Sequence, residues 1–104
     1  MKYFIDTHDR TKGSFPAEAV DEAEFFAMFD ALEAACPQFG VGAHAAHVNL
    51  EDGKAFCFMS GADAEAVRKA HEAVNLPFDS ITEVKRVTGA DLRFPQPARK
   101  ASAA

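Results

Sequence analysis

The sequence predicts an α+β domain with the element order βαββαβ. Segments rich in β-branched and aromatic residues alternate with two segments rich in Ala and Glu that have helical spacing. The dipeptide Asp52-Gly53 between two apolar segments is typical of a tight β-hairpin. The chain of 104 residues fits one hydrophobic core better than two. The strands are expected at residues 2–7, 41–50, 54–59 and 80–88.

The first helix is expected over about residues 16–36. Phe25, Phe29, Leu32 and Cys36 recur at spacings of four, three and four, which places them on one stripe. Two starting points are possible from the sequence. Either Pro16 begins the helix early, or Asp21 caps it with Glu24 three residues further on, and Pro37 and Gly40 end it in both cases.

The third strand and the second helix have clear boundaries. Residues 54–59 are apolar at consecutive positions, so we expect both faces of this strand to be covered. Asp63 is suited to cap a helix in which Val67, His71 and Val74 share one face, and Pro77 ends that helix.

This order predicts a ferredoxin-like sandwich over residues 1–90, with an antiparallel sheet and two helices on one face. The other face would then expose apolar side chains of the third strand. Burial against a second copy is the simplest remedy, so we expect a homodimer. Residues 91–104 are rich in Pro and Ala, which predicts a C-terminal tail.

Composition excludes several classes of function. The net charge of -5 and pI near 5.2 argue against nucleic acid as a partner. No apolar segment is long enough to span a membrane, and the N-terminus does not have the pattern of a signal peptide, so a cytoplasmic location is expected. Phosphate-binding loops and the Gly-x-Ser-x-Gly motif of serine hydrolases are also missing from the sequence.

Histidines are the main candidates for chemistry. Asp6 and His8 lie two positions apart on the first strand, so both side chains point to one face, as suits a metal ligand pair or an oriented base. The alternative is that Asp6 and His8 have no site role and are solvated residues at the end of the strand. His44 and His47 should point to opposite faces of the second strand; His47 shares its face with Asn49 and is the better ligand candidate, whereas His44 is expected to be a plain surface residue.

Three further side chains are candidates with structural alternatives. His71 lies on the sheet-facing stripe of the second helix, where a hydrogen-bonded core histidine is the more common outcome. Cys57 either packs as a small hydrophobic residue or provides a thiolate for a soft metal, whereas Cys36 is expected to be structural. Glu83 is either a ligand, an acid/base group or a charge on an edge strand.

Several segments together resemble a known family. They occur in this order: Phe-Ile-Asp-Thr-His at 4–8 with Lys-Gly at 12–13, Gly-Lys-Ala-Phe-Cys at 53–57, Glu-Ala-Val at 65–67 with His-Glu at 71–72, and Ile-Thr-Glu-Val at 81–84. The combination resembles the small nickel-binding ferredoxin-like proteins of bacteria, first described as a domain of unknown function, over residues 3 to about 85. One departure is Asp9, where the family can carry a second histidine after the position of His8.

The resemblance implies a dimeric ferredoxin-like fold that binds nickel or a similar divalent ion, with no established reaction. Its matching positions are His8, Cys57, His71 and Glu83. We therefore expect a small cytoplasmic protein that binds a divalent transition metal, with His8 and His47 as nitrogen ligands and Asp6 or Glu83 supplying oxygen. Two alternatives remain: a cofactor-independent enzyme that uses His71 with Asp6 or Glu83 on a small molecule, and a purely structural or regulatory dimer.

Overall fold

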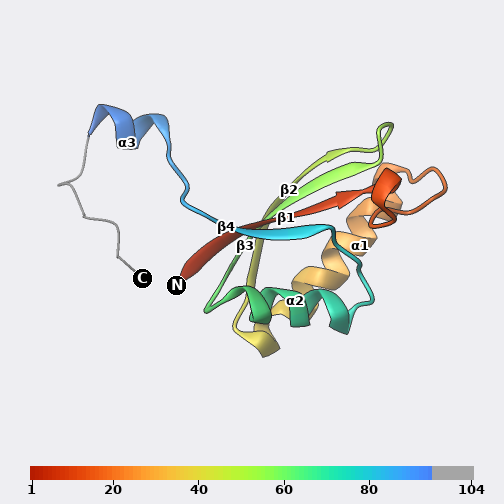
Figure 1. Ribbon diagram of the computed structural model, residues 1–104, viewed down its shortest axis with the longest axis horizontal. Coiled ribbons are helices and arrows are strands. Elements are labelled where there is room, and N and C mark those ends of the chain that lie inside the picture. The colour runs from red at the N-terminus through yellow and green to blue at the C-terminus, as the bar shows by residue number, and fades with distance from the viewer. Residues whose placement is uncertain (95–104) are drawn as a thin grey trace.

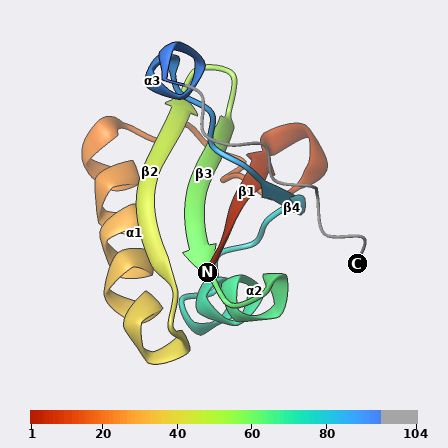
Figure 2. The same ribbon diagram turned by 90° about the vertical axis from the view of Figure 1, so that its left-hand side faces the viewer.

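Four strands form one antiparallel sheet in the order β2-β3-β1-β4, and helices α1 and α2 cover one of its faces (Figures 1 and 2). The computed structural model describes residues 1–94. The α+β class and the four-stranded antiparallel sheet are therefore confirmed. In chain order the elements are β1 (Lys2–Asp9), the short helix η1 (Arg10–Lys12), α1 (Glu22–Ala35), η2 (Cys36–Phe39), β2 (Gly42–Asn49), β3 (Lys54–Gly61), α2 (Ala64–Ala73), β4 (Ser80–Val84) and α3 (Gly89–Arg93).

Helix α1 begins at Glu22, so the earlier start at Pro16 is wrong. The Asp21 carboxylate accepts a hydrogen bond from the Glu24 amide at 2.8 Å, and the Glu24 side chain accepts from the Asp21 amide, which completes a capping box. The chain before it is held as a loop because Phe15 is buried and packs beneath the Arg10 guanidinium. Capping chemistry and loop packing together fix the helix start.

Strand β3 alternates between the two faces of the sheet over residues 54–59. Ala55, Cys57 and Met59 are buried beneath the helices, whereas Phe56 on the opposite face is 44% exposed. Within the single chain only one face of β3 is covered, as a sandwich with both helices on one side requires, and the cover of the other face by a second copy stays a prediction. Aromatic side chains are left on the face without helices, which we call the open face.

Strand β2 contains a β-bulge that changes the direction of one histidine. Ala43 pairs with Met59 and Ala45 pairs with Phe58, so His44 is the extra residue between them. Its Nε2 atom lies 2.7 Å from the Ser60 hydroxyl, and its ring is 5.7 Å from the Phe58 ring. Both His44 and His47 consequently line the open face, and the prediction that they point to opposite faces is wrong because a bulge shifts the alternation by one residue.

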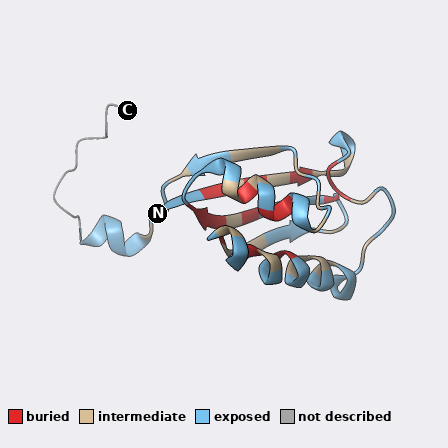
Figure 3. Ribbon diagram, turned by 90° about the horizontal axis from the view of Figure 1, so that it is seen from below, coloured by how far each residue is buried: buried red, intermediate tan, exposed pale blue. Residues whose placement is uncertain are grey.

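The buried core lies between the sheet and the two helices (Figure 3). Helix α2 contributes Val67, Ala70 and His71 to it, whereas Leu32 is the one fully buried residue of α1. Within residues 1–94, no helix is long and apolar enough to cross a membrane.

The last strand and the C-terminal segment differ in part from expectation. Strand β4 ends at Val84 rather than at residue 88, and a short helix α3, none of whose residues is buried, follows at Gly89–Arg93. Figure 1 shows α3 beyond the end of the sheet. Residues 95–104, which make up most of the predicted tail, lie outside the described residues.

Candidate metal centre

Asp6 is a fully buried carboxylate in the middle of the sheet. It lies on β1, which is flanked by β3 and β4, and its neighbours across the two ladders are Cys57 and Ile81. Phe4, Asp6 and His8 follow each other at every second position, so strand alternation turns all three beneath the helices. An apolar strand pattern thus carries two polar side chains into the core.

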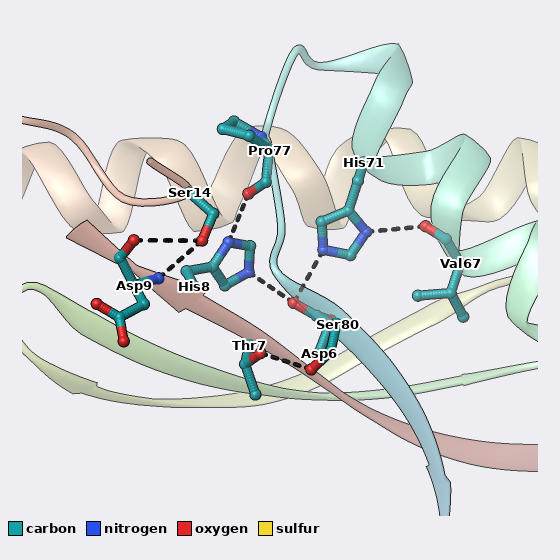
Figure 4. A network of polar contacts seen from close by, with 9 residues as sticks. All are labelled: Asp6, Thr7, His8, Asp9, Ser14, Val67, His71, Pro77 and Ser80. Carbon is teal, nitrogen blue, oxygen red and sulfur yellow. Dashed lines mark hydrogen bonds and ion pairs between the residues drawn. The ribbon is translucent and has the colours of Figure 1, made fainter. Parts of the chain in front are cut away.

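Two histidines meet the same oxygen of this carboxylate (Figure 4). The Nε2 atom of His8 is 2.6 Å from Asp6 Oδ1, and the Nε2 atom of His71 is 3.0 Å from it. The other ring nitrogens face backbone carbonyls: His8 Nδ1 is 2.7 Å from the oxygen of Pro77, and His71 Nδ1 is 2.8 Å from that of Val67. A carbonyl only accepts, so each Nδ1 donates, and each Nε2 is directed at Asp6.

Asp6 and the imidazole of His71 stabilise each other's charged forms. Burial disfavours the charged form of His71, but its hydrogen bond to Asp6 and the charge of that carboxylate raise the pKa of His71 above its ordinary value. Burial likewise disfavours ionised Asp6, but the hydrogen bonds from His71 and His8 keep the pKa of Asp6 below its ordinary value. The metal-free site therefore favours an ionised carboxylate with a protonated imidazole beside it.

Cys57 completes the group from the neighbouring strand. Donor atoms of Asp6, His8 and Cys57 all lie within 4.8 Å of one another, and all three residues are buried. Burial and the nearby Asp6 carboxylate raise the pKa of the Cys57 thiol well above its ordinary value, so the sulfur carries its proton when no metal is present. We call Asp6, His8, Cys57 and His71 the buried cluster.

One atom of the buried cluster is unsatisfied. Asp6 Oδ2 is buried and has no hydrogen-bond partner among the described residues. A buried unpaired carboxylate oxygen costs free energy, and a missing ion is one of the standard explanations for such an atom.

The structure does not bring the other predicted ligands to this place. His47 is exposed on the open face of β2, opposite Phe56. Glu83 lies on edge strand β4, where its side chain is 60% exposed and pairs with Lys2 at 3.7 Å. Cys36 is buried in the core, as expected of a structural cysteine, and burial raises its pKa to about 11.

Sequence reasoning named every side chain of the buried cluster but missed the backbone groups that orient it. The carbonyl of Val67 lies one helical turn before His71, so the spacing of four residues was an available signal. The carbonyl of Pro77 reaches His8 from a loop that is 69 positions away in sequence, and no local pattern indicates that contact.

The donor set suits a transition metal ion. Two donor atoms bound to one ion at about 2.1 Å, with a right angle between them, are about 3 Å apart. The contacts of Asp6 Oδ1 with the two Nε2 atoms, at 2.6 and 3.0 Å, are close to that spacing. Imidazole nitrogen with carboxylate oxygen and thiolate sulfur is a combination that nickel, cobalt and zinc accept.

Comparisons with known proteins identify the family of this chain. Among curated proteins none matches it. The crystal structure of SCO4226 from Streptomyces coelicolor A3(2) is similar in fold, with a TM-score of 0.71, 24% identity and coverage of 83% of this chain and 99% of that one. The NMR structure of the heavy metal binding protein TM0320 from Thermotoga maritima is more distant, with a TM-score of 0.40, 16% identity and coverage of 79% and 98%. The model of the SCO4226-like nickel responsive proteins matches residues 4–84, from β1 to the end of β4, and the chain belongs to that family.

Proposed function

We propose that this protein binds a divalent transition metal ion, nickel in particular, through the buried cluster. One observation carries the proposal: the Nε2 atoms of His8 and His71 converge on one oxygen of Asp6 while each Nδ1 is fixed by a carbonyl. Histidines that ligate metals almost always donate their other ring N–H in this way, which fixes the tautomer and the ring direction. The family description supports nickel as the ion.

The ligands would be the His8 Nε2 atom, an Asp6 oxygen and the Cys57 sulfur, whose donor atoms lie within 4.8 Å of one another. The His71 Nε2 atom, 3.0 Å from Asp6 Oδ1, would complete the set after moving towards the ion. A bound ion would take the place of the proton between His71 Nε2 and Asp6 Oδ1, and the thiol would lose its proton as well. It would also give the unpaired Asp6 Oδ2 a cation nearby. Metal binding would therefore relieve a feature that is costly in the metal-free protein, the unpaired carboxylate oxygen.

Nickel titration by calorimetry tests this assignment. With protein purified without metal-affinity chromatography, we expect His8→Ala and His71→Ala each to weaken nickel binding by at least tenfold, about 1.4 kcal/mol, because each removes a coordinating imidazole. The matched controls His44→Ala and His47→Ala make the same chemical change on the open face and should leave the affinity within about twofold.

Variants of His47 and Glu83 test whether these two predicted ligands bind the ion instead. If His47→Ala or Glu83→Ala weakens nickel binding and the two cluster variants do not, the ion binds at the surface and the buried cluster is structural. A protein that gives no heat with nickel, cobalt or zinc contradicts metal binding altogether. Elemental analysis of the purified protein provides a second, independent readout.

The enzymatic alternative is less well supported by the geometry. His71 and Asp6 do meet at 3.0 Å, as a base and its orienting acid should. However, Nδ1 of His71 is held by Val67 and Nε2 by Asp6, and both side chains are fully buried. No ring nitrogen is left to reach a substrate, so metal binding is the preferred function.

We also propose that two copies associate through the open face. The strand order β2-β3-β1-β4 is the one expected of a ferredoxin-like split βαβ arrangement, which leaves that face without helices. Tyr3 and Phe56 are 41% and 44% exposed there, and Tyr3 stacks on Phe58 with ring centroids 5.4 Å apart. Aromatic side chains gathered on one uncovered face are typical of an interaction surface.

Sedimentation at micromolar concentration tests the dimer. We expect twice the chain mass of 11.2 kDa for the natural sequence and a shift towards the monomer for Phe56→Ser, which removes an aromatic ring from the centre of the open face. Phe26→Ser is the matched control, since Phe26 is 68% exposed on α1 and away from that face. A monomeric natural protein would contradict the proposal.

We propose a cytoplasmic location for the same protein. Cys36 and Cys57 are both free and buried, which agrees with a reducing compartment. The division into a domain over residues 1–90 and a tail over 91–104 also stays a prediction.

A further inference from the structure

A cavity of about 670 Å³, partly open to solvent, lies between the N-terminal half of α1 and the sheet. Its wall is mostly apolar, and His8 and Cys57 of the buried cluster adjoin it although they are only 4% and 3% exposed. Small-molecule sites are largely apolar cavities of about 300–1,000 Å³. The apolar lining includes Phe15, Phe25, Met28, Phe29, Leu32 and Leu76.

The cavity exists because α1 approaches the sheet closely only near its C-terminal end. Leu32 is fully buried there, whereas Met28 and Phe25, one and two turns earlier, are half-buried. Opposite them the sheet presents the small side chain of Ala55, which is 1% exposed. Large helix residues over a small strand residue leave space that neither element fills.

A loop is held in place beside this space. The Nε atom of Arg10 donates to the carbonyl of Pro16 at 2.9 Å, and the guanidinium lies over the Phe15 ring at 5.3 Å from its centroid. Its two other nitrogens donate to the carbonyls of Leu50 and Glu51 at 3.4 Å. The wall formed by Phe15 and Pro16 is therefore fixed by hydrogen bonds from Arg10 rather than being free to collapse onto the helix.

We infer that the cavity is a binding site for an uncharged, mostly apolar organic molecule. Arg10 is the one permanently charged residue among the described residues of the lining, and carbonyls accept from three of its five N–H groups. An anion would find only the remaining N–H groups of Arg10, and the lining has no carboxylate to receive a cation. Apolar surface is what the wall offers, so the ligand is selected by shape and by burial of its carbons.

This site goes beyond metal binding, because the cavity needs no ion for its shape. Its test therefore uses the metal-free protein, and the result does not depend on whether nickel binds.

Calorimetry with three probes tests the chemistry. We expect 2-naphthol to bind at least tenfold more tightly than phenol, because its second ring buries further apolar surface. We expect naphthalene-2-sulfonate to bind at least tenfold more weakly than 2-naphthol, because its sulfonate would lose water against a mostly apolar wall. A protein that binds none of the probes at millimolar concentration, or that prefers the sulfonate, overturns the inference.

Two filling variants test the location. Ala55→Leu fills the cavity from the sheet and Met28→Trp fills it from α1, so each should weaken 2-naphthol binding by at least tenfold. Ala45→Leu, on the open face of β2, is the matched control and should bind the probe as the natural sequence does. If circular dichroism shows that Ala55→Leu fails to fold, Met28→Trp alone decides. Binding that survives the folded filling variants, or that is lost in Phe56→Ser instead, places the probe on the open face and overturns the inference.

Discussion

Replacement of Asp6 with alanine is expected to lower the free energy of unfolding of the metal-free protein by about 3–5 kcal/mol. The substitution leaves the Nε2 atoms of His8 and His71 without an acceptor in a region where neither ring can reach water. It also leaves a small void beside Cys57, its neighbour across the β1–β3 ladder. Urea unfolding near pH 6, where a protonated imidazole pairs with the carboxylate, measures the change.

Two further variants separate the sources of that loss. Asp30→Ala removes an exposed aspartate from α1 and should change the free energy of unfolding by less than about 0.5 kcal/mol. Asp6→Asn keeps the shape of the side chain but removes its charge, so the part of the loss that it reproduces is electrostatic. If Asp6→Ala costs less than about 1 kcal/mol, the contacts of the buried cluster do not stabilise the metal-free fold.

The buried cluster is an inefficient way to stabilise a core. Asp6 Oδ2 is unpaired, and a buried acceptor left without a donor costs about 1–3 kcal/mol. Apolar side chains of similar volume often serve a core as well as or better than a buried ion pair. A small domain that keeps a carboxylate, two imidazoles and a thiol together in its interior therefore has a reason other than packing, and metal binding provides one.

The sequence predicts the members of the buried cluster better than their arrangement. Strand alternation places Asp6 and His8 on one face, and helical spacing turns His71 towards the sheet. Their meeting depends on which strands are neighbours, and the ladder that places Asp6 opposite Cys57 is set by packing across 51 positions of sequence, which periodicity does not report.

Periodicity alone also explains the predictions that the structure corrects, because it does not report bulges, strand edges or the cover of a second face. One inserted residue at His44 reverses the facing of a strand end. The local signal is Gly42, where a Cβ would lie 2.9 Å from Ser60 Oγ and 3.0 Å from the His44 ring. Glu83 interrupts an apolar pattern, but an edge strand allows its carboxylate to reach solvent and Lys2. Apolar runs also cannot show whether the second face of a strand is covered by the same chain, as Phe56 illustrates.

Nickel at about 100 times its dissociation constant is expected to raise the free energy of unfolding by about 2.7 kcal/mol, provided that the unfolded chain does not bind it. For a domain of this size, that corresponds to an increase in Tm of roughly 10–20 °C. Thermal unfolding with and without nickel measures the shift, and a chelator should reverse it. His71→Ala should lose most of the shift and His47→Ala should keep it, because only His71 belongs to the buried cluster.

The pH dependence of this stabilisation should be opposite to that of the metal-free protein. The pKa of His71 is raised in the folded state, so its pair with Asp6 stabilises fully below the unfolded pKa of about 6.5 and loses that contribution as the pH rises through the folded value. Nickel bound at the buried cluster would have to displace the same proton, and that of the Cys57 thiol, so its contribution should grow as the pH rises. Melting curves between about pH 5.5 and 8 should therefore converge at the acidic end and separate at the basic end. A nickel shift that stays constant over this range would mean that the ion displaces no proton and binds outside the buried cluster.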